Sequence, residues 1–189
     1  MSKQLTVTAT RIRCHDPQDP FLDELYFITG SKEKSHTSVT KRKIRKGFDE
    51  PVKIELLKTE IDETGITPIQ VTLWEQRALR DNSAAAKALQ DNAAKAAKFA
   101  KEHFKGLAWP ELVIQISGWL LDNAASFFKH IFRDSPLGTK EIVIPRVAAK
   151  DENHDFPASI DGQYQVHFTA EGHKGSYYHY DIDIAVVIE

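Results

Sequence analysis

The residues best suited to chemistry lie in one acidic segment near the start of the sequence, CHDPQDPFLDELYF, residues 14–27. Its carboxylates lie close together, and two prolines stiffen the turn between them. The acidic residues are Asp16, Asp19, Asp23 and Glu24. Hard cations such as Ca²⁺ take about six to eight oxygen ligands, mostly from carboxylates and carbonyls. One loop does not easily supply them all, so a calcium site here requires a second acidic loop beside the first.

Two later acidic residues are candidates for that second loop. Glu75 ends an apolar pattern in VTLWEQR, and Asp134 precedes another apolar run in FRDSPLG. A long insertion separates these two acids, but a helical hairpin returns the chain close to where it left. We therefore expect Glu75 and Asp134 at the same end of the fold as the 14–27 segment.

The elements that must position these acids are mostly strands. Alternating apolar and polar residues, with β-branched and aromatic enrichment, indicate about eight strands. They cover 4–13, 24–30, 35–44, 52–61, 67–76, 138–145, 162–172 and 176–189. The region between the fifth and sixth strands differs, because residues 81–106 are rich in Ala and Lys and residues 109–133 place apolar residues at helical spacing. We predict one β-sandwich domain over 1–189 with a two-helix hairpin inserted at 81–133.

The order of these motifs resembles the calcium-binding C2-type β-sandwich, and bacterial C2-like sandwiches in particular. An acidic turn precedes an aromatic strand in DPQDPFLDELYF. An apolar-Trp-acidic step follows in LWEQ, and DSPLG closes the second loop before the apolar strand EIVIP. The resemblance implies a mainly β, antiparallel, eight-stranded C2-like sandwich that binds Ca²⁺. It implies Asp16, Asp23, Glu75 and Asp134 as ligands, with Asp19 next.

Two features depart from the family pattern. The second loop of the family usually carries an Asp two residues beyond its first acid, and this chain has Arg77 there. The long helical insertion also stands where the family has only a short turn. A purely structural explanation of the acidic turn stays open, because Asp and Pro are common in surface turns and charges at edge strands oppose aggregation.

Basic and aromatic residues suggest a surface that contacts a membrane or a protein partner. The run KRKIRK at 41–46 and the lysines of the first predicted helix suit anionic headgroups, and tryptophans suit a membrane interface. The candidates are Lys41, Arg42, Lys43, Lys95, Lys98, Trp109 and Trp119. Packing of the second helix on the sandwich, with a solvated basic face on the first, is the simpler alternative. The longest uncharged stretch, 112–121, is about half of the roughly twenty residues that span a bilayer.

Composition excludes several classes of function. A net charge of −2, from 25 basic and 27 acidic residues, does not favour nucleic-acid binding. The single cysteine, Cys14, cannot form an internal disulfide. The eight histidines are scattered, although His167, His173 and His179 could meet across a C-terminal hairpin as a transition-metal site. Because no nucleophile and base can be paired from the sequence, we do not expect an enzyme.

The sequence thus predicts a non-enzymatic calcium-binding interaction module whose helical insertion contacts a partner or a membrane. One alternative is a membrane-active toxin or lytic protein whose hairpin inserts into lipid. Another is a carbohydrate-binding sandwich that uses Tyr177, Tyr178 and Tyr180. The first residues, MSKQLTVTAT, lack the apolar core of a signal peptide. We expect a cytoplasmic protein, or one exported without a classical signal peptide.

Overall fold

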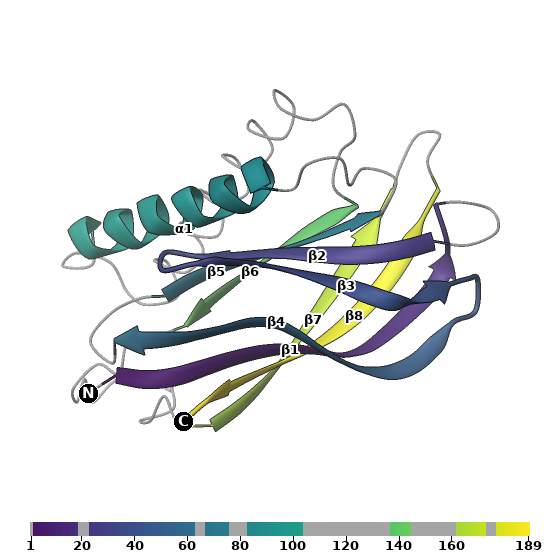
Figure 1. The fold of residues 1–189 in the computed structure, drawn as a ribbon, viewed down its shortest axis with the longest axis horizontal. Coiled ribbons are helices and arrows are strands. Elements are labelled where there is room, and N and C mark those ends of the chain that lie inside the picture. Colours follow the sequence, from purple (N-terminus) through teal and green to yellow (C-terminus); the bar gives the residue numbers. More distant parts are fainter. Residues whose placement is uncertain are drawn as a thin grey trace.

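The computed structural model describes residues 2–18, 23–62, 67–75, 83–103, 137–144, 162–172 and 177–189. These residues form a mainly β structure with two antiparallel sheets and a helix on one side (Figure 1). The strands are β1 (Ser2–Asp16), β2 (Asp23–Ser31), β3 (Ser35–Ile44), β4 (Asp49–Asp62), β5 (Thr67–Glu75), β6 (Gly138–Ile144), β7 (Gly162–Glu171) and β8 (His179–Ile188). The helix is α1 (Ser83–His103).

Each sheet has four strands. The first sheet has the order β4-β1-β8-β7, and the second has the order β3-β2-β5-β6. β1 is central in the first sheet, where it pairs antiparallel with β4 on one side and β8 on the other. Strands that follow each other in sequence therefore often belong to different sheets, so the fold depends on pairings between distant parts of the chain.

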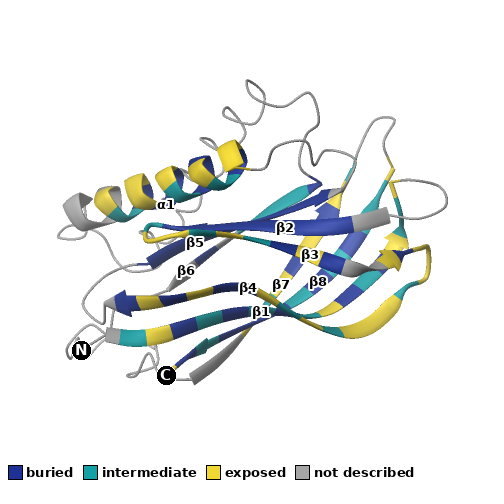
Figure 2. Ribbon diagram, in the orientation of Figure 1, coloured by how far each residue is buried: buried dark blue, intermediate teal, exposed yellow. Residues whose placement is uncertain are grey.

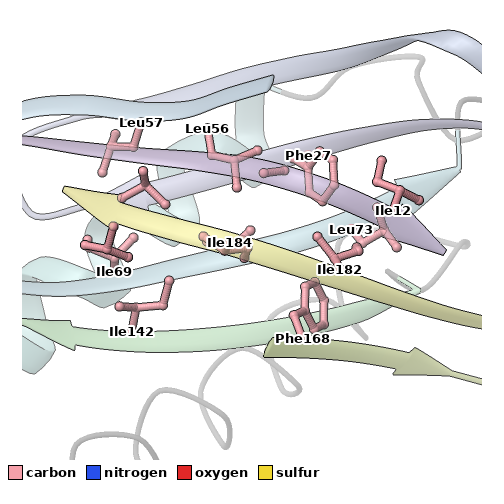
Figure 3. Close-up of a cluster of buried hydrophobic side chains, with 14 of the residues drawn as sticks. Ile12, Phe27, Leu56, Leu57, Ile69, Leu73, Ile142, Phe168, Ile182 and Ile184 are labelled. Atoms are coloured by element: carbon pink, nitrogen blue, oxygen red, sulfur yellow. The ribbon is translucent and has the colours of Figure 1, made fainter. Parts of the chain in front are cut away.

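The two sheets enclose one hydrophobic core, to which every strand except β3 and β6 contributes several fully buried side chains. Alternation along the strands produces this core, since successive strand residues point to opposite faces. In β8, Tyr180, Ile182 and Ile184 are fully buried while the residues between them are partly exposed. Figure 3 shows Ile182 and Ile184 beside Phe168 and Leu73, in the middle of this cluster. The predicted two-sheet sandwich architecture is therefore confirmed at this level.

Helix α1 covers the outer face of the second sheet, over β2 and β5 (Figure 1). Its buried side consists mainly of alanines, with Leu89 packed against Tyr26, Ile28 and Trp74. The helix lies unusually close to β2, because a Cβ atom added at Gly30 would stand 2.5 Å from the backbone carbonyl carbon of Leu89. Glycine at position 30 thus permits the close packing of helix on sheet.

The predicted two-helix hairpin is corrected to one helix among the described residues. α1 covers the Ala- and Lys-rich segment that was predicted as the first helix. It needs no partner helix to bury its apolar side, because the second sheet already covers that side. The predicted second helix, 109–133, lies outside the described residues together with Trp109 and Trp119. The lytic alternative rests on that segment and stays a prediction.

The two ends of the described chain are paired with each other. The amide of Gln4 donates to the carbonyl of Glu189 at 2.7 Å, and the amide of Glu189 donates to the carbonyl of Gln4 at 3.0 Å. These bonds extend the β1–β8 ladder, in which Leu5 stands opposite Ile188.

Among the residues described, no helix combines the length and the apolar character that crossing a bilayer requires.

Candidate metal sites at one end of the sandwich

One end of the sandwich collects the strand ends that carry most of the predicted ligands. β1 ends at Asp16 and β2 begins at Asp23, whose register partner in β3 is Ile44. In the second sheet Leu25 stands opposite Glu75, so the end of β5 lies beside the start of β2. β6 starts there as well, and so does β8 (on the right in Figure 1). The backbone thus brings Asp16, Asp23 and Glu75 to the same end.

The structure describes the five predicted ligands to different extents. The side chain of Asp16 is described and half exposed, whereas only the backbone is described at Asp23 and Glu75. Asp19 and Asp134 lie outside the described residues. β1 also continues through Asp16, so the acidic turn is shorter than the sequence suggested, because pairing with β8 extends the strand to that residue.

Asp16 already has a cationic partner. The Nζ atom of Lys46 lies 2.5 Å from Asp16 Oδ1, and both side chains are exposed. The hydrogen bond with Asp16, together with the charge of that carboxylate, raises the pKa of Lys46. Lys46 belongs to the basic run 41–46, which the sequence analysis assigned to partner binding rather than to this site. A metal ion at Asp16 would have to displace this lysine.

The candidate partner-binding residues are spread over two elements. Lys43 is exposed on β3, and Lys95 and Lys98 are exposed on α1. The backbone of Lys41 and Arg42 belongs to β3, but their side chains are not described. The described lysines of α1 lie on the side of the helix that faces away from the sheet, where exposed residues appear in yellow in Figure 2.

A second group of polar residues lies on the outer face of the first sheet, at the same end. We call it the polar ladder, and it occupies neighbouring positions on β1, β8 and β7. Its members are Arg11, Arg13 and His15 on β1, His179, Asp181 and Asp183 on β8, and His167, Thr169 and Glu171 on β7. The residues between them, such as Ile12, Tyr180 and Phe168, are buried in the core. The period-two alternation therefore gathers all ladder side chains on one face.

Asp181 is the centre of the ladder. Its Oδ2 atom lies 2.9 Å from His15 Nε2, and its Oδ1 atom lies 3.6 Å from His179 Nε2. His167 Nε2 lies 3.4 Å from Oδ1, and the hydroxyl of Thr169 donates to the same oxygen at 2.8 Å. One carboxylate therefore faces three imidazoles drawn from three adjacent strands.

The pairing of β1 with β8 is irregular at His15. The register with β8 shifts between Cys14, opposite Tyr180, and Asp16, opposite His179. This shift leaves His15 as an extra residue, as in a β-bulge, which is a common way to redirect a side chain at a sheet edge or site. The ring centroids of His15 and His179 lie 4.4 Å apart. Within the described parts of the chain, His15, His179 and Asp181 offer metal-binding atoms that all lie within 4.8 Å of one another.

The surroundings of Asp181 keep it ionised. Partial burial raises the pKa of its carboxyl group, but hydrogen bonds from Thr169 and His15 and the charges of His179 and His167 together lower it further. The net result is a pKa below the ordinary value. Asp181 is thus a carboxylate at neutral pH, the form that can accept a hydrogen bond or bind a metal ion.

The part of the polar ladder farther from His15 is made of ion pairs. Arg13 Nη2 lies 2.5 Å from Asp183 Oδ2, and His167 Nδ1 lies 3.1 Å from Asp183 Oδ1. Arg11 pairs with Asp49 of β4 at 2.6 Å. These arginines occupy their carboxylates and exclude a cation from that part of the face. The metal-binding potential is therefore confined to the His15 end.

This cluster differs from the transition-metal site predicted from the sequence. The predicted residues were His167, His173 and His179, of which His173 lies outside the described residues, and His15 was not among them. The available signal was the alternation in HYDID and VHFTAE, which puts His and Asp on one strand face. The missing information was the pairing of β1 with β8, because no local pattern shows which distant strands are neighbours.

The three tyrosines of the proposed sugar-binding face do not act together. Tyr180 is fully buried in the core. Tyr178 is partly buried, and its hydroxyl donates to the carbonyl of Leu137 at 2.8 Å. Tyr177 alone is widely exposed, at 78% of its surface. A flat sugar-stacking surface made of all three residues is therefore excluded.

Comparison with known proteins identifies no family: no family model matches the chain, and no curated protein matches it.

Proposed function

We propose that this protein is a non-enzymatic calcium-binding interaction module with a C2-like β-sandwich. The convergence of the strand ends that carry Asp16, Asp23 and Glu75 is the observation that supports the proposal. Carboxylates from separate loops at one end of a sandwich can supply the oxygen ligands that Ca²⁺ requires. Asp19 and Asp134 would complete the set, because Asp19 lies between Asp16 and Asp23 in the sequence and Asp134 shortly precedes β6, whose first residue stands opposite Leu73 of β5.

In this proposal Lys46 acts as an internal counter-ion when calcium is absent. Its ammonium group neutralises Asp16 at 2.5 Å, and calcium would replace it. Both side chains are exposed, so the exchange requires little rearrangement and the ion pair itself contributes little stability. Release of Lys46 would also return one positive charge to the basic run 41–46, beside the bound cation.

The module would have two basic surfaces at opposite ends of β3. The basic run lies at the calcium end, whereas the exposed side of α1 that carries Lys95 and Lys98 lies beyond Gln90, which contacts Glu33 in the β2–β3 turn. Either surface suits an anionic membrane or an acidic protein partner, and bound calcium would add positive charge beside the basic run. We propose no catalytic role, and Cys14, the single thiol of the chain, is buried in the core rather than available as a nucleophile.

Thermal unfolding with Ca²⁺ or with chelator tests the calcium site. Calcium at about a hundred times its dissociation constant stabilises the folded state by about 2.7 kcal/mol. For a chain of this length the midpoint should rise by roughly 5–11 °C. Mg²⁺ at the same concentration serves as the control for a general ionic effect.

A pair of variants tests the ligand assignment. Asp16→Asn combined with Glu75→Gln should abolish the calcium-induced shift. Glu60→Gln, an exposed acid of β4 opposite Gln4 at the other end of the sandwich, should retain it. Absence of any shift in the wild-type protein would refute the calcium site, and an equal shift in the double variant would refute these ligands.

A further inference from the structure

We propose a second, chemically different metal site, in which His15, His179 and Asp181 bind a transition-metal ion such as Zn²⁺. Glu171 on the neighbouring strand β7 would supply the fourth ligand. This site lies next to the proposed calcium site, because Asp16 stands opposite His179 in the register, but it differs in using the imidazole nitrogens of two histidines on the sheet face. The three principal ligands lie on adjacent strands whose pairing the core fixes.

The distances between the ligand atoms match what zinc needs. Two atoms that each lie about 2.1 Å from a tetrahedral zinc ion are separated from each other by about 3.4 Å. His15 Nε2 and Asp181 Oδ2 are 2.9 Å apart, and His179 Nε2 and Asp181 Oδ1 are 3.6 Å apart. Glu171 Oε1 lies 3.4 Å from His179 Nε2. His15, His179 and Asp181 thus already hold their ligand atoms within 4.8 Å of one another, and the carboxylate of Glu171 would turn from His179 towards the ion as the fourth ligand.

The ligand types select the class of metal. Imidazole nitrogen favours Zn²⁺, Cu²⁺ or Ni²⁺, whereas Ca²⁺ takes oxygen ligands. A pair of histidines with one or two carboxylates is a donor set of the zinc type. The same atoms would therefore discriminate against calcium, and the two proposed sites can be distinguished by the ion that each one binds.

The surroundings orient the central carboxylate. Thr169 donates to Asp181 Oδ1 at 2.8 Å, and His167 lies 3.4 Å from the same oxygen. Groups of this kind around a metal ligand fix its orientation and raise metal affinity. Asp181 is only 19% exposed, whereas the side chains of His15 and His179 are 49% and 36% exposed. The carboxylate is thus held in place while the imidazoles remain open to an ion from solution.

The site is also accessible from a hollow of about 200 Å³. This hollow is lined by His179 and Glu171 of the proposed site and by Asp16, Gly172, Tyr177 and Tyr178. An ion can enter from this hollow and keep a water or partner group as a further ligand. Arg13 stands opposite Asp181 in the register, but its guanidinium group pairs with Asp183, and Arg11 pairs with Asp49, so neither arginine occupies the site.

Calorimetric titration of untagged protein with ZnCl₂ is the first test, with Co²⁺ as a spectroscopic probe of His and carboxylate ligation. We expect one zinc ion per chain. His15→Ala combined with His179→Ala should reduce the affinity at least about tenfold for each ligand removed. His36→Ala removes an exposed histidine of β3, in the other sheet, and should leave the affinity unchanged.

Asp181→Asn keeps the shape of the central side chain and should also reduce zinc affinity at least about tenfold. Circular dichroism checks that each variant is folded. Absence of zinc binding by the wild-type protein, or equal affinity in the double-histidine variant, would overturn the site. The double-histidine variant should keep the calcium-induced stabilisation, and Glu75→Gln should keep zinc binding, so failure of one proposal is distinguishable from failure of the other.

Discussion

The two outer faces of the sandwich follow the same alternation of residues but have opposite environments. On the second sheet, the outward-facing residues Gln70, Thr72 and Trp74 are buried, on the face that α1 covers. On the first sheet, the outward-facing His15, Asp181 and Asp183 remain in contact with solvent and with one another. Both faces contain polar residues. Among the described residues, the open face alone groups histidine and carboxylate side chains closely enough to bind one ion.

The comparison shows that polarity along a strand does not reveal exposure. Threonine and glutamine tolerate burial because they carry no charge, and they suit a face covered by a helix rich in alanine. Aspartate, arginine and histidine require water or charged partners, which the polar ladder supplies through ion pairs between strands. The size and charge of the outward-facing residues distinguish the covered face from the open one.

The largest expected effect comes from weakening the covered face. Leu89→Ala removes the principal apolar anchor of α1, which is fully buried against Tyr26 and Trp74. We expect a loss of about 2–5 kcal/mol in the free energy of unfolding, measured by urea denaturation. Lys87→Ala, at an exposed position of the same helix, should change it by less than about 0.5 kcal/mol. Similar values for the two variants would mean that α1 contributes little to stability.

A smaller effect is expected from crowding the same face. Gly30→Ala introduces a methyl group 2.5 Å from the backbone of Leu89, so the helix must shift away from β2. Overpacking of this kind typically costs about 1–3 kcal/mol. The control is Ser35→Ala at the start of β3, opposite Gly30 in the register. A gain in stability for Gly30→Ala, from reduced freedom of the unfolded chain, would contradict the close packing.

The smallest effect is expected on the open face, and it depends on pH. Burial raises the pKa of Asp183, but hydrogen bonds and charges from His167 and Arg13 lower it further, so the net shift is downward. A folded-state pKa below the unfolded value means that the stabilisation is present above about pH 4 and is lost as the pH falls through the folded-state pKa. The contribution should be about 1 kcal/mol or less, because the side chains are partly exposed.

Asp183→Asn should therefore be less stable than the wild-type protein at pH 6. The difference in stability between the two proteins should become smaller as the pH approaches 3. Thermal unfolding of both proteins across this range gives the comparison. Asp91→Asn, on the exposed side of α1, is the matched control and should follow the wild-type curve. A difference between Asp183→Asn and wild type that grows towards low pH would contradict the sign of the pKa shift.

The sequence predicted those parts of the molecule that depend on local pattern. Alternation located the strands, as in the IDIAVV segment of β8, and the high helix propensity of alanine and lysine located α1. The two-helix hairpin is corrected to one helix among the described residues, and the apolar side of that helix is covered by the second sheet. Glu75 lies beside the start of β2 because the strand register places it opposite Leu25.

The metal-binding potential of the ladder could not be predicted in the same way. His15 and Asp181 lie 2.9 Å apart but belong to opposite ends of the sequence, and only the pairing of β1 with β8 brings them together. The pairing of Asp16 with Lys46 likewise depends on the turn between β3 and β4. Sites built from neighbouring strands require knowledge of strand order, which period-two patterns do not contain.

The ladder between β1 and β8 also has a consequence for the order of folding. Residue 5 pairs with residue 188, so the central seam of the first sheet can form only after almost the entire chain has been brought together. Contacts of such high sequence separation carry a large loop-closure cost and slow the folding of β-rich proteins. The metal-ligand cluster of His15, His179 and Asp181 spans this seam. It therefore exists only once β1 and β8 have paired, and a bound ion would join two segments that lie far apart in the sequence.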